Sequence, residues 1–112
     1  MDSSSAVQEV IETIRDGYEP GRIVLFGSRI WGTPGDESDL DLLVIKSSAK
    51  PEIERMQEVY RLVDRYQRRP YRLPLDILVK TLAEIRHPLA IGDHFIRQIM
   101  ERGRVVYERA AV

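Results

Sequence analysis

The spacing of apolar residues along the chain predicts helices that alternate with strands. Apolar side chains recur at helical intervals in four segments, and four short runs rich in β-branched and aliphatic residues have the composition of strands. The expected helices run from Ser5 to Asp16, from Pro51 to Tyr66, from Thr81 to before Pro88, and from Asp93 to Gly103. The expected strands are Arg22 to Phe26, Asp39 to Ile45, Leu75 to Val79, and Arg104 to Glu108. This alternation predicts an α/β (α+β) fold, a mixed sheet flanked by helices.

Two stretches have the spacing of a capping box, in which a hydroxyl side chain and a glutamate or glutamine three residues later bond each other's backbone. They are Ser5 to Gln8 and Thr81 to Glu84, and each is expected to begin a helix. In the last expected helix an apolar stripe is expected to belong to the core, and the alternative is that part of it is exposed to a partner. Its members are Phe95, Ile96, Ile99 and Met100.

Length and composition favour one soluble domain that spans residues 1–112. The chain has 112 residues, of which 43% are hydrophobic and 31% charged, and its net charge is −1. A balance so close to neutral lacks the broad positive field of a nucleic-acid-binding protein, so direct nucleic-acid binding is not expected.

The absence of cysteine excludes disulfides and thiolate metal sites. With no signal-like N-terminus and no long apolar run, a cytoplasmic protein without a membrane span is expected.

The first expected strand ends at Gly27-Ser28, a pair that suits close approach of the backbone to a ligand. Glycine tolerates turn conformations, and free N–H groups at the start of a helical turn attract anions. Gly27 and Ser28 are therefore candidates for a phosphate site. The alternative is an ordinary tight turn, because many turns use the same two residue types.

Asp39 and Asp41 lie two residues apart at the start of the second expected strand. Alternate side chains of a strand share a face, so the two carboxylates point the same way while Leu40 and Leu42 face the core. Like charges held this close favour a bound cation, and oxygen ligands favour Mg²⁺. The alternative is a solvated strand end with two turn-capping aspartates.

Asp76 is the third candidate, because it interrupts the otherwise apolar run from Leu75 to Val79. A bare carboxylate in a buried strand is costly, which favours a metal-binding or catalytic role. The alternative is a residue on an edge strand that pairs with an arginine. Three carboxylates beside a phosphate-binding turn would supply the charge neutralisation, alignment and base that phosphoryl-group transfer needs.

These residues resemble a known signature. Gly27-Ser28, ten intervening residues and then Asp39-Leu40-Asp41 are similar to the G-S-x10-D-x-D motif of the DNA polymerase β-like nucleotidyltransferase superfamily. The resemblance continues through Asp76 to the C-terminal segment, so it covers nearly the whole chain. Within the superfamily the chain resembles the minimal nucleotidyltransferases, which are often antitoxins encoded beside a HEPN-domain toxin.

The resemblance implies a palm-like sheet of the polymerase β type, with ATP as donor and Mg²⁺ as cofactor. By this resemblance Gly27 and Ser28 would hold the β- and γ-phosphates, and Asp39 and Asp41 would bind the metal ions. Asp76 would complete the second metal site and help to deprotonate the acceptor hydroxyl.

One position departs from the family pattern. Trp31 stands where many relatives carry a basic residue between the serine and the next glycine. If that basic side chain touches phosphate, Arg29 is the candidate that replaces it. Arg29 therefore joins the expected nucleotide-binding residues.

The leading functional hypothesis is transfer of AMP from ATP to a hydroxyl of a partner protein. The expected acceptor is a tyrosine of a HEPN toxin, and the two proteins are expected to form a hetero-oligomer. Relatives that modify antibiotics or extend nucleic acids generally add a domain that binds the acceptor, whereas nearly all residues of this chain are expected to belong to the catalytic core. Two alternatives stay open. One is a non-catalytic antitoxin that masks its toxin by contact, and the other is a nucleotidyltransferase for a small molecule of the aminoglycoside type.

Overall fold

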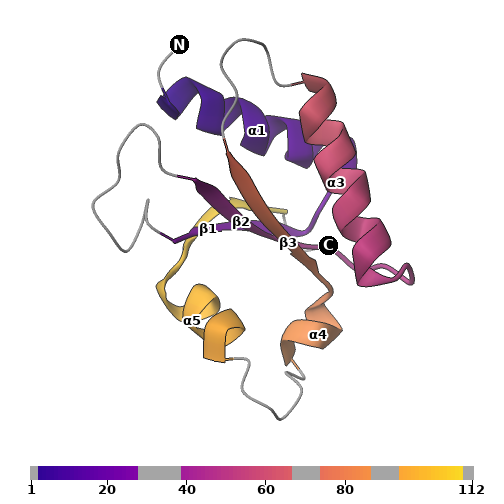
Figure 1. Ribbon diagram of the computed structural model, residues 1–112. Helices are drawn as coiled ribbons and strands as arrows, with labels where there is room; N and C mark the ends of the chain where they lie inside the picture. Colours follow the sequence, from indigo (N-terminus) through magenta and orange to yellow (C-terminus); the bar gives the residue numbers. More distant parts are fainter. Residues whose placement is uncertain (1–2, 28–38, 67–73, 87–93, 110–112) are drawn as a thin grey trace.

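The computed structural model describes residues 3–27, 39–66, 74–86 and 94–109 (Figure 1). The helices are α1 (Ser3–Tyr18), α3 (Glu52–Tyr66), α4 (Leu82–Arg86) and α5 (His94–Arg102). The strands are β1 (Arg22–Phe26), β2 (Leu40–Ile45), β3 (Leu75–Lys80) and β4 (Arg104–Glu108). No helix in these ranges has both the length and the apolar character that crossing a bilayer requires.

The strands form one four-stranded sheet in the order β3-β2-β1-β4. Strand β1 pairs antiparallel with both β2 and β4, whereas β2 and β3 are parallel. The parallel pair needs a crossover, and α3 provides it between β2 and β3. The expected mixed sheet flanked by helices is therefore confirmed.

Helices cover both faces of the sheet, with α1 and α3 on one side and α4 and α5 on the other (Figure 1). The larger core cluster joins α1 and α3 to one face of the sheet and includes Ile14, Val59, Leu40, Leu42 and Ile77. The smaller cluster lies under α5 and consists of Val24, Phe26, Leu43, Ile45, Ile96 and Ile99. Because β2 contributes to both clusters, its sequence is almost uniformly apolar, as in a central strand covered on two sides.

Helix α1 differs from its expected bounds at both ends. It begins at Ser3, so Ser5 lies within the helix and does not cap it. It also continues through Gly17 to Tyr18, and Glu19 then takes a left-handed conformation with φ of 55°. Gly17 does not end the helix because it lies against α3, where an added Cβ would come 2.6 Å from a methyl carbon of Leu62. A residue without a side chain lets the two helices approach at this point.

The second expected capping box is confirmed at the start of α4. The Thr81 N–H donates to Glu84 Oε1 at 2.7 Å, and the Glu84 N–H donates to Thr81 Oγ1 at 3.1 Å. The same Glu84 carboxylate accepts from Arg55 Nη2 at 2.9 and 3.0 Å. Arg55 is only 3% exposed, and its Nε has no hydrogen-bond partner among the described residues. Glu84 thus caps α4 and neutralises a buried arginine of α3.

The charge state of Glu84 follows from these contacts. Partial burial works to raise its pKa, but the hydrogen bonds from the Thr81 backbone and from Arg55 outweigh that effect and lower the pKa below the ordinary 4.5. A carboxylate whose pKa falls on folding stabilises the protein above its unfolded pKa. That stabilisation is lost as the pH falls through the lower, folded pKa.

We therefore expect Glu84→Ala to lower the free energy of unfolding by about 1–3 kcal/mol at neutral pH, because it removes charged hydrogen bonds and leaves Arg55 poorly compensated. The difference from the wild type should shrink as the pH falls from the ordinary pKa of 4.5 through the lower pKa that Glu84 has in the folded protein. Urea denaturation at pH 7 and pH 3 measures both effects. Glu101→Ala, at an exposed position of α5, is the control and should change little. An equal loss at both pH values would contradict this account of Glu84.

Candidate functional site

One row of residues crosses three strands at the end of the sheet where β1 finishes and β2 and β3 begin. Asp41 of β2 is in register with Phe26 of β1 on one side and with Asp76 of β3 on the other. Neighbouring strands lie about 4.8 Å apart, so the backbones that carry the two aspartates are adjacent. The sheet therefore brings together two residues that are far apart in the sequence.

Both aspartates leave the sheet on the face covered by α5. In β2, Leu40 and Leu42 enter the core under α1 and α3, whereas Leu43 belongs to the core under α5. Alternation then places the Asp41 side chain on the α5 face. By the same argument in β3, Ile77 lies under α1 and α3, so Asp76 faces the α5 side. The expectation that Leu40 and Leu42 are buried opposite Asp41 is confirmed.

Gly27 follows β1 directly and lies against the Asp41 carboxylate. Its φ is 83°, a conformation that side-chain-bearing residues rarely adopt. A Cβ built at this position would lie 2.0 Å from Asp41 Oδ2 and 2.8 Å from Asp41 Cγ. Glycine is therefore required for two reasons: the backbone conformation of the turn, and the space that the Asp41 carboxylate occupies. The backbone of the turn therefore borders the aspartate row, and the phosphate-binding role of Gly27 stays a prediction.

Asp39 directly precedes β2 and is exposed. The structure pairs Asp41 with Asp76 across two strands and leaves Asp39 outside the ladder. In the part of the chain that is described, no group of three or more acidic or histidine side chains is arranged to hold a metal ion. A ligand role for Asp39 stays a prediction.

Asp76 has a different environment from the one its sequence suggests. It was expected to be a costly buried carboxylate, but β3 is an edge strand of the sheet and Asp76 is exposed. The argument from the cost of burial is therefore wrong for this residue. The pairing with an arginine that was the alternative is also not seen within the described ranges. What singles out Asp76 is its register with Asp41.

The edge of β3 is held next to Asp76 by a side chain of α3. The Ile77 N–H donates to the hydroxyl of Tyr60 at 2.7 Å. This bond satisfies a donor on the outer edge of the strand that no further strand can reach. Tyr60 thereby helps to fix the backbone on which Asp76 is carried.

Three residues of the expected site lie outside the described residues. They are Ser28 and Arg29, which were expected to contact phosphate, and Trp31, the departure from the family pattern. Asp93, where the last expected helix begins, also lies outside them, and α5 begins at His94.

The chemistry of the row fits a hard divalent cation. Mg²⁺ prefers oxygen ligands and is usually bound by one or two carboxylates together with substrate phosphates and water. Asp41 and Asp76 offer carboxylates on neighbouring strands, and the space at Gly27 lets the turn backbone come close to them. Asp41 and Asp76 are the residues that would hold such an ion. Asp39, two residues before Asp41, is the third candidate ligand.

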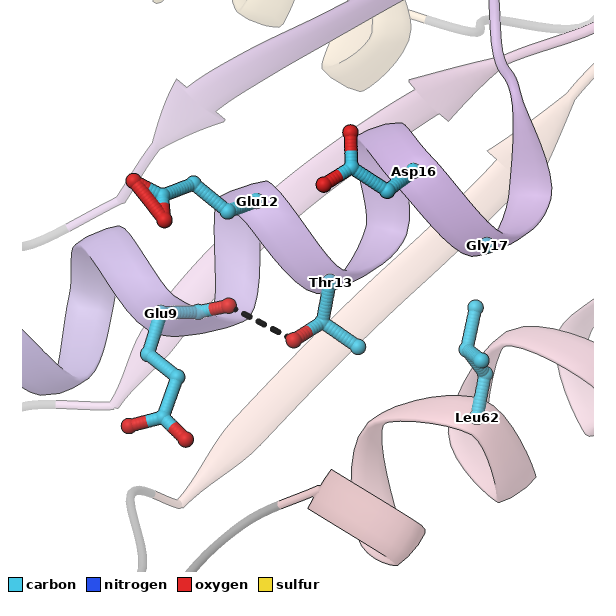
Figure 2. Close-up of a pocket in the computed structure, with 6 residues that line it drawn as sticks. All are labelled: Glu9, Glu12, Thr13, Asp16, Gly17 and Leu62. Atoms are coloured by element: carbon cyan, nitrogen blue, oxygen red, sulfur yellow. Dashed lines mark hydrogen bonds between the residues drawn. The ribbon is translucent and has the colours of Figure 1, made fainter.

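A second group of carboxylates lies in a groove elsewhere on the molecule. The groove has a volume of about 440 Å³ between α1 and α3, and it is lined by Glu9, Glu12, Thr13, Asp16, Gly17 and Leu62. Figure 2 shows the acidic side chains on α1, with Leu62 of α3 facing Gly17. Helix α1 covers the sheet face opposite to the aspartate row. This groove is therefore separate from the candidate site.

The apolar stripe of α5 is divided between the core and the surface. Of the stripe assigned to the core, Ile96 and Ile99 are buried, but Phe95 is 48% exposed. Its ring meets the ring of Phe26 edge to face, with centroids 5.6 Å apart and planes at 82°. Helical periodicity identifies the stripe but not which of its members the rest of the fold covers.

The family comparison identifies the class of protein. Residues 8–111 match the family model described as polymerase beta, nucleotidyltransferase. The match spans almost the whole chain, so the protein belongs to the polymerase beta nucleotidyltransferase family. A search of curated proteins gave no match.

Solved structures with the same fold agree with this assignment. A nucleotidyltransferase-like protein from Sulfolobus solfataricus has a TM-score of 0.62 at 18% identity, covering 96% of this chain and 84% of its own. A toxin–antitoxin structure with AMP-PNP has a TM-score of 0.61 at 20% identity, covering 93% of this chain and 74% of its own. The MntA–HepT toxin–antitoxin structure has a TM-score of 0.57 at 17% identity, with coverages of 95% and 73%. The fold is that of the polymerase β nucleotidyltransferases.

Gly27 provides a test of the site geometry. We expect Gly27→Ala to lower the free energy of unfolding by about 1–2 kcal/mol from the left-handed backbone alone, and further because the new methyl group displaces the Asp41 carboxylate. Gly21→Ala, at the opposite end of β1, is the matched control, since its Cβ would meet nothing closer than Ile45 O at 3.6 Å. Urea denaturation of both variants gives the comparison. Equal stability of the two variants would show that Gly27 is not constrained as described.

Proposed function

We propose that this protein transfers AMP from Mg²⁺-ATP to a hydroxyl of a partner protein, with a tyrosine of a HEPN-type toxin as the acceptor. The observation that carries the proposal is the row in which Asp41 and Asp76 stand on adjacent strands beside the Gly27 turn. Acidic side chains bordering a glycine turn suit the binding of a triphosphate together with a cation.

Each residue of the site has a proposed role. The backbone of Gly27 and Ser28 binds the β- and γ-phosphates, and Arg29 adds a positive charge to them. Asp39, Asp41 and Asp76 are the proposed metal ligands. Mg²⁺, when bound, neutralises charge on the triphosphate and stabilises the charge that develops during transfer.

The proposed transfer is an in-line displacement at the α-phosphorus. The phenolic oxygen of the acceptor forms a bond to this phosphorus while the bond to the oxygen bridging the β-phosphate breaks. Pyrophosphate leaves with the electron pair of that bond, and the phenolic proton passes to the Asp76 carboxylate. Because Asp76 is exposed on an edge strand, an acceptor carried by another protein can reach it.

The structural relatives support a toxin-directed role. Proteins of the same fold have been crystallised as toxin–antitoxin pairs, one of them with AMP-PNP. AMP-PNP is an analogue of ATP, which fits ATP as the proposed donor. A stable complex with the toxin is proposed on the same ground.

The test is transfer of label from ATP marked at the α-phosphate to a purified HEPN-domain partner in the presence of Mg²⁺. We expect label on one tyrosine of the partner, with none when Mg²⁺ is chelated. Asp41→Asn and Asp76→Asn should each reduce the rate about 100-fold or more, because both remove charge from the reacting centre. Glu9→Gln, which changes a carboxylate in the groove on the other face, is the control and should retain the wild-type rate.

The other outcomes separate the competing functions. If an Asp39→Ala, Asp41→Ala variant neutralises the partner as well as the wild type does, masking by contact is sufficient and the catalytic proposal fails. Label on an aminoglycoside in place of the protein would indicate a small-molecule acceptor. Failure of label to reach either acceptor, with nucleotide binding intact, would reject both proposed acceptor classes.

A further inference from the structure

An exposed aromatic ring lies next to the aspartate row, and the roles proposed above do not use it. Phe95, in the first turn of α5, is 48% exposed although its ring contacts the buried ring of Phe26. The edge-to-face contact holds the Phe95 ring in a defined orientation while leaving about half of the residue open to solvent.

The position of Phe26 connects this ring to the site. Phe26 is the Cα partner of Asp41, and it belongs to the core cluster under α5, so its side chain leaves the sheet on the same face as the Asp41 carboxylate. The Phe95 ring contacts the Phe26 ring, so it lies on the sheet face to which the Asp41 carboxylate belongs. A nucleotide whose phosphates lie at Asp41 and Gly27 would have its base on this same face.

Exposure alone would carry no conclusion, because isolated apolar side chains are common on protein surfaces. The described residues include three other exposed large hydrophobic side chains, namely Ile53, Leu82 and Val105. None of them is aromatic, and none belongs to α5. Phe95 combines an aromatic face, a fixed orientation and a place beside the row.

We propose that Phe95 is the stacking platform for the base of the donor nucleotide, an inference that rests on the proposed nucleotidyltransferase function. Stacking on an aromatic ring uses the face of the base and does not read its hydrogen-bonding edge. Phe95 therefore selects donors by the area of the ring system. ATP and GTP bind with similar affinity through this contact, and CTP binds more weakly.

The test compares two probes that share the phosphates and differ in the base. Calorimetry with Mg²⁺ measures the affinity of ATP and of inorganic tripolyphosphate for the wild type, Phe95→Leu and Phe95→Tyr. Phe95→Leu should weaken ATP binding about 10- to 100-fold and leave tripolyphosphate binding unchanged, while Phe95→Tyr retains both affinities. Ile53→Ala, which removes another side chain with 62% exposure, is the control and should alter neither.

The outcomes distinguish this inference from the function on which it rests. Unchanged ATP binding in Phe95→Leu would overturn the stacking role, and so would equal weakening of both probes, which indicates a structural effect through Phe26. If the wild type binds neither ATP nor tripolyphosphate, the proposed function itself fails and the stacking role falls with it.

Discussion

The pairing register of β2 determines what this sheet can bind. Asp41 faces α5, and therefore shares a row with Asp76, only while β2 keeps its present alignment between β1 and β3. Because side chains alternate, a slip of one residue would move Asp41 into the core under α1 and α3 and bring Leu42 out of it. Burying an unpaired carboxylate there is costly, so the same alternation that stabilises the core also fixes the position of the acid.

Several contacts converge on this register. Leu40 and Leu42 are fully buried on one face, and Leu43 is fully buried on the other, so neither face tolerates a shift. At the start of the strand the Leu40 N–H donates to Pro74 O at 2.9 Å, which aligns β2 with the beginning of β3. On the β1 side, Gly27 lies against the Asp41 carboxylate, and only a residue without Cβ leaves room for it. Rigid strands rather than loops thus carry the two acids.

Much of the fold follows from local patterns in the sequence. Strands β1 and β4 begin and end at the residues expected from their composition, and β2 and β3 differ from their expected bounds by one residue at one end. Gly27 also ends β1 in a turn, as the sequence predicts. These features were predictable because turn chemistry and strand periodicity are local properties.

The rest depends on contacts between distant segments. The sequence suggests that Asp76 is buried, because its neighbours are apolar, but the edge position of β3 is set by strand order. The burial of Arg55 against Glu84 joins residues of α3 and α4, and no periodicity predicts it. Phe95 fits an apolar stripe, yet it is 48% exposed and packs on Phe26 of a distant strand. In each case the local pattern predicts the helix or strand, and tertiary packing determines the exposure and the contacts of the side chain.

The two acidic groups of this molecule illustrate why placement matters more than charge. Asp16, in the groove on α1, has an arginine beside it, and the hydrogen bond from Arg15 lowers the pKa of Asp16. Glu12 accepts a hydrogen bond from Gln8 on the same exposed helix surface. These contacts join neighbouring residues of one helix. Asp41 and Asp76 extend from adjacent, paired strands, and a glycine turn leaves open the space beside one of them. Their short side chains cannot separate far without breaking the ladder, so a single divalent cation could be bound by both carboxylates.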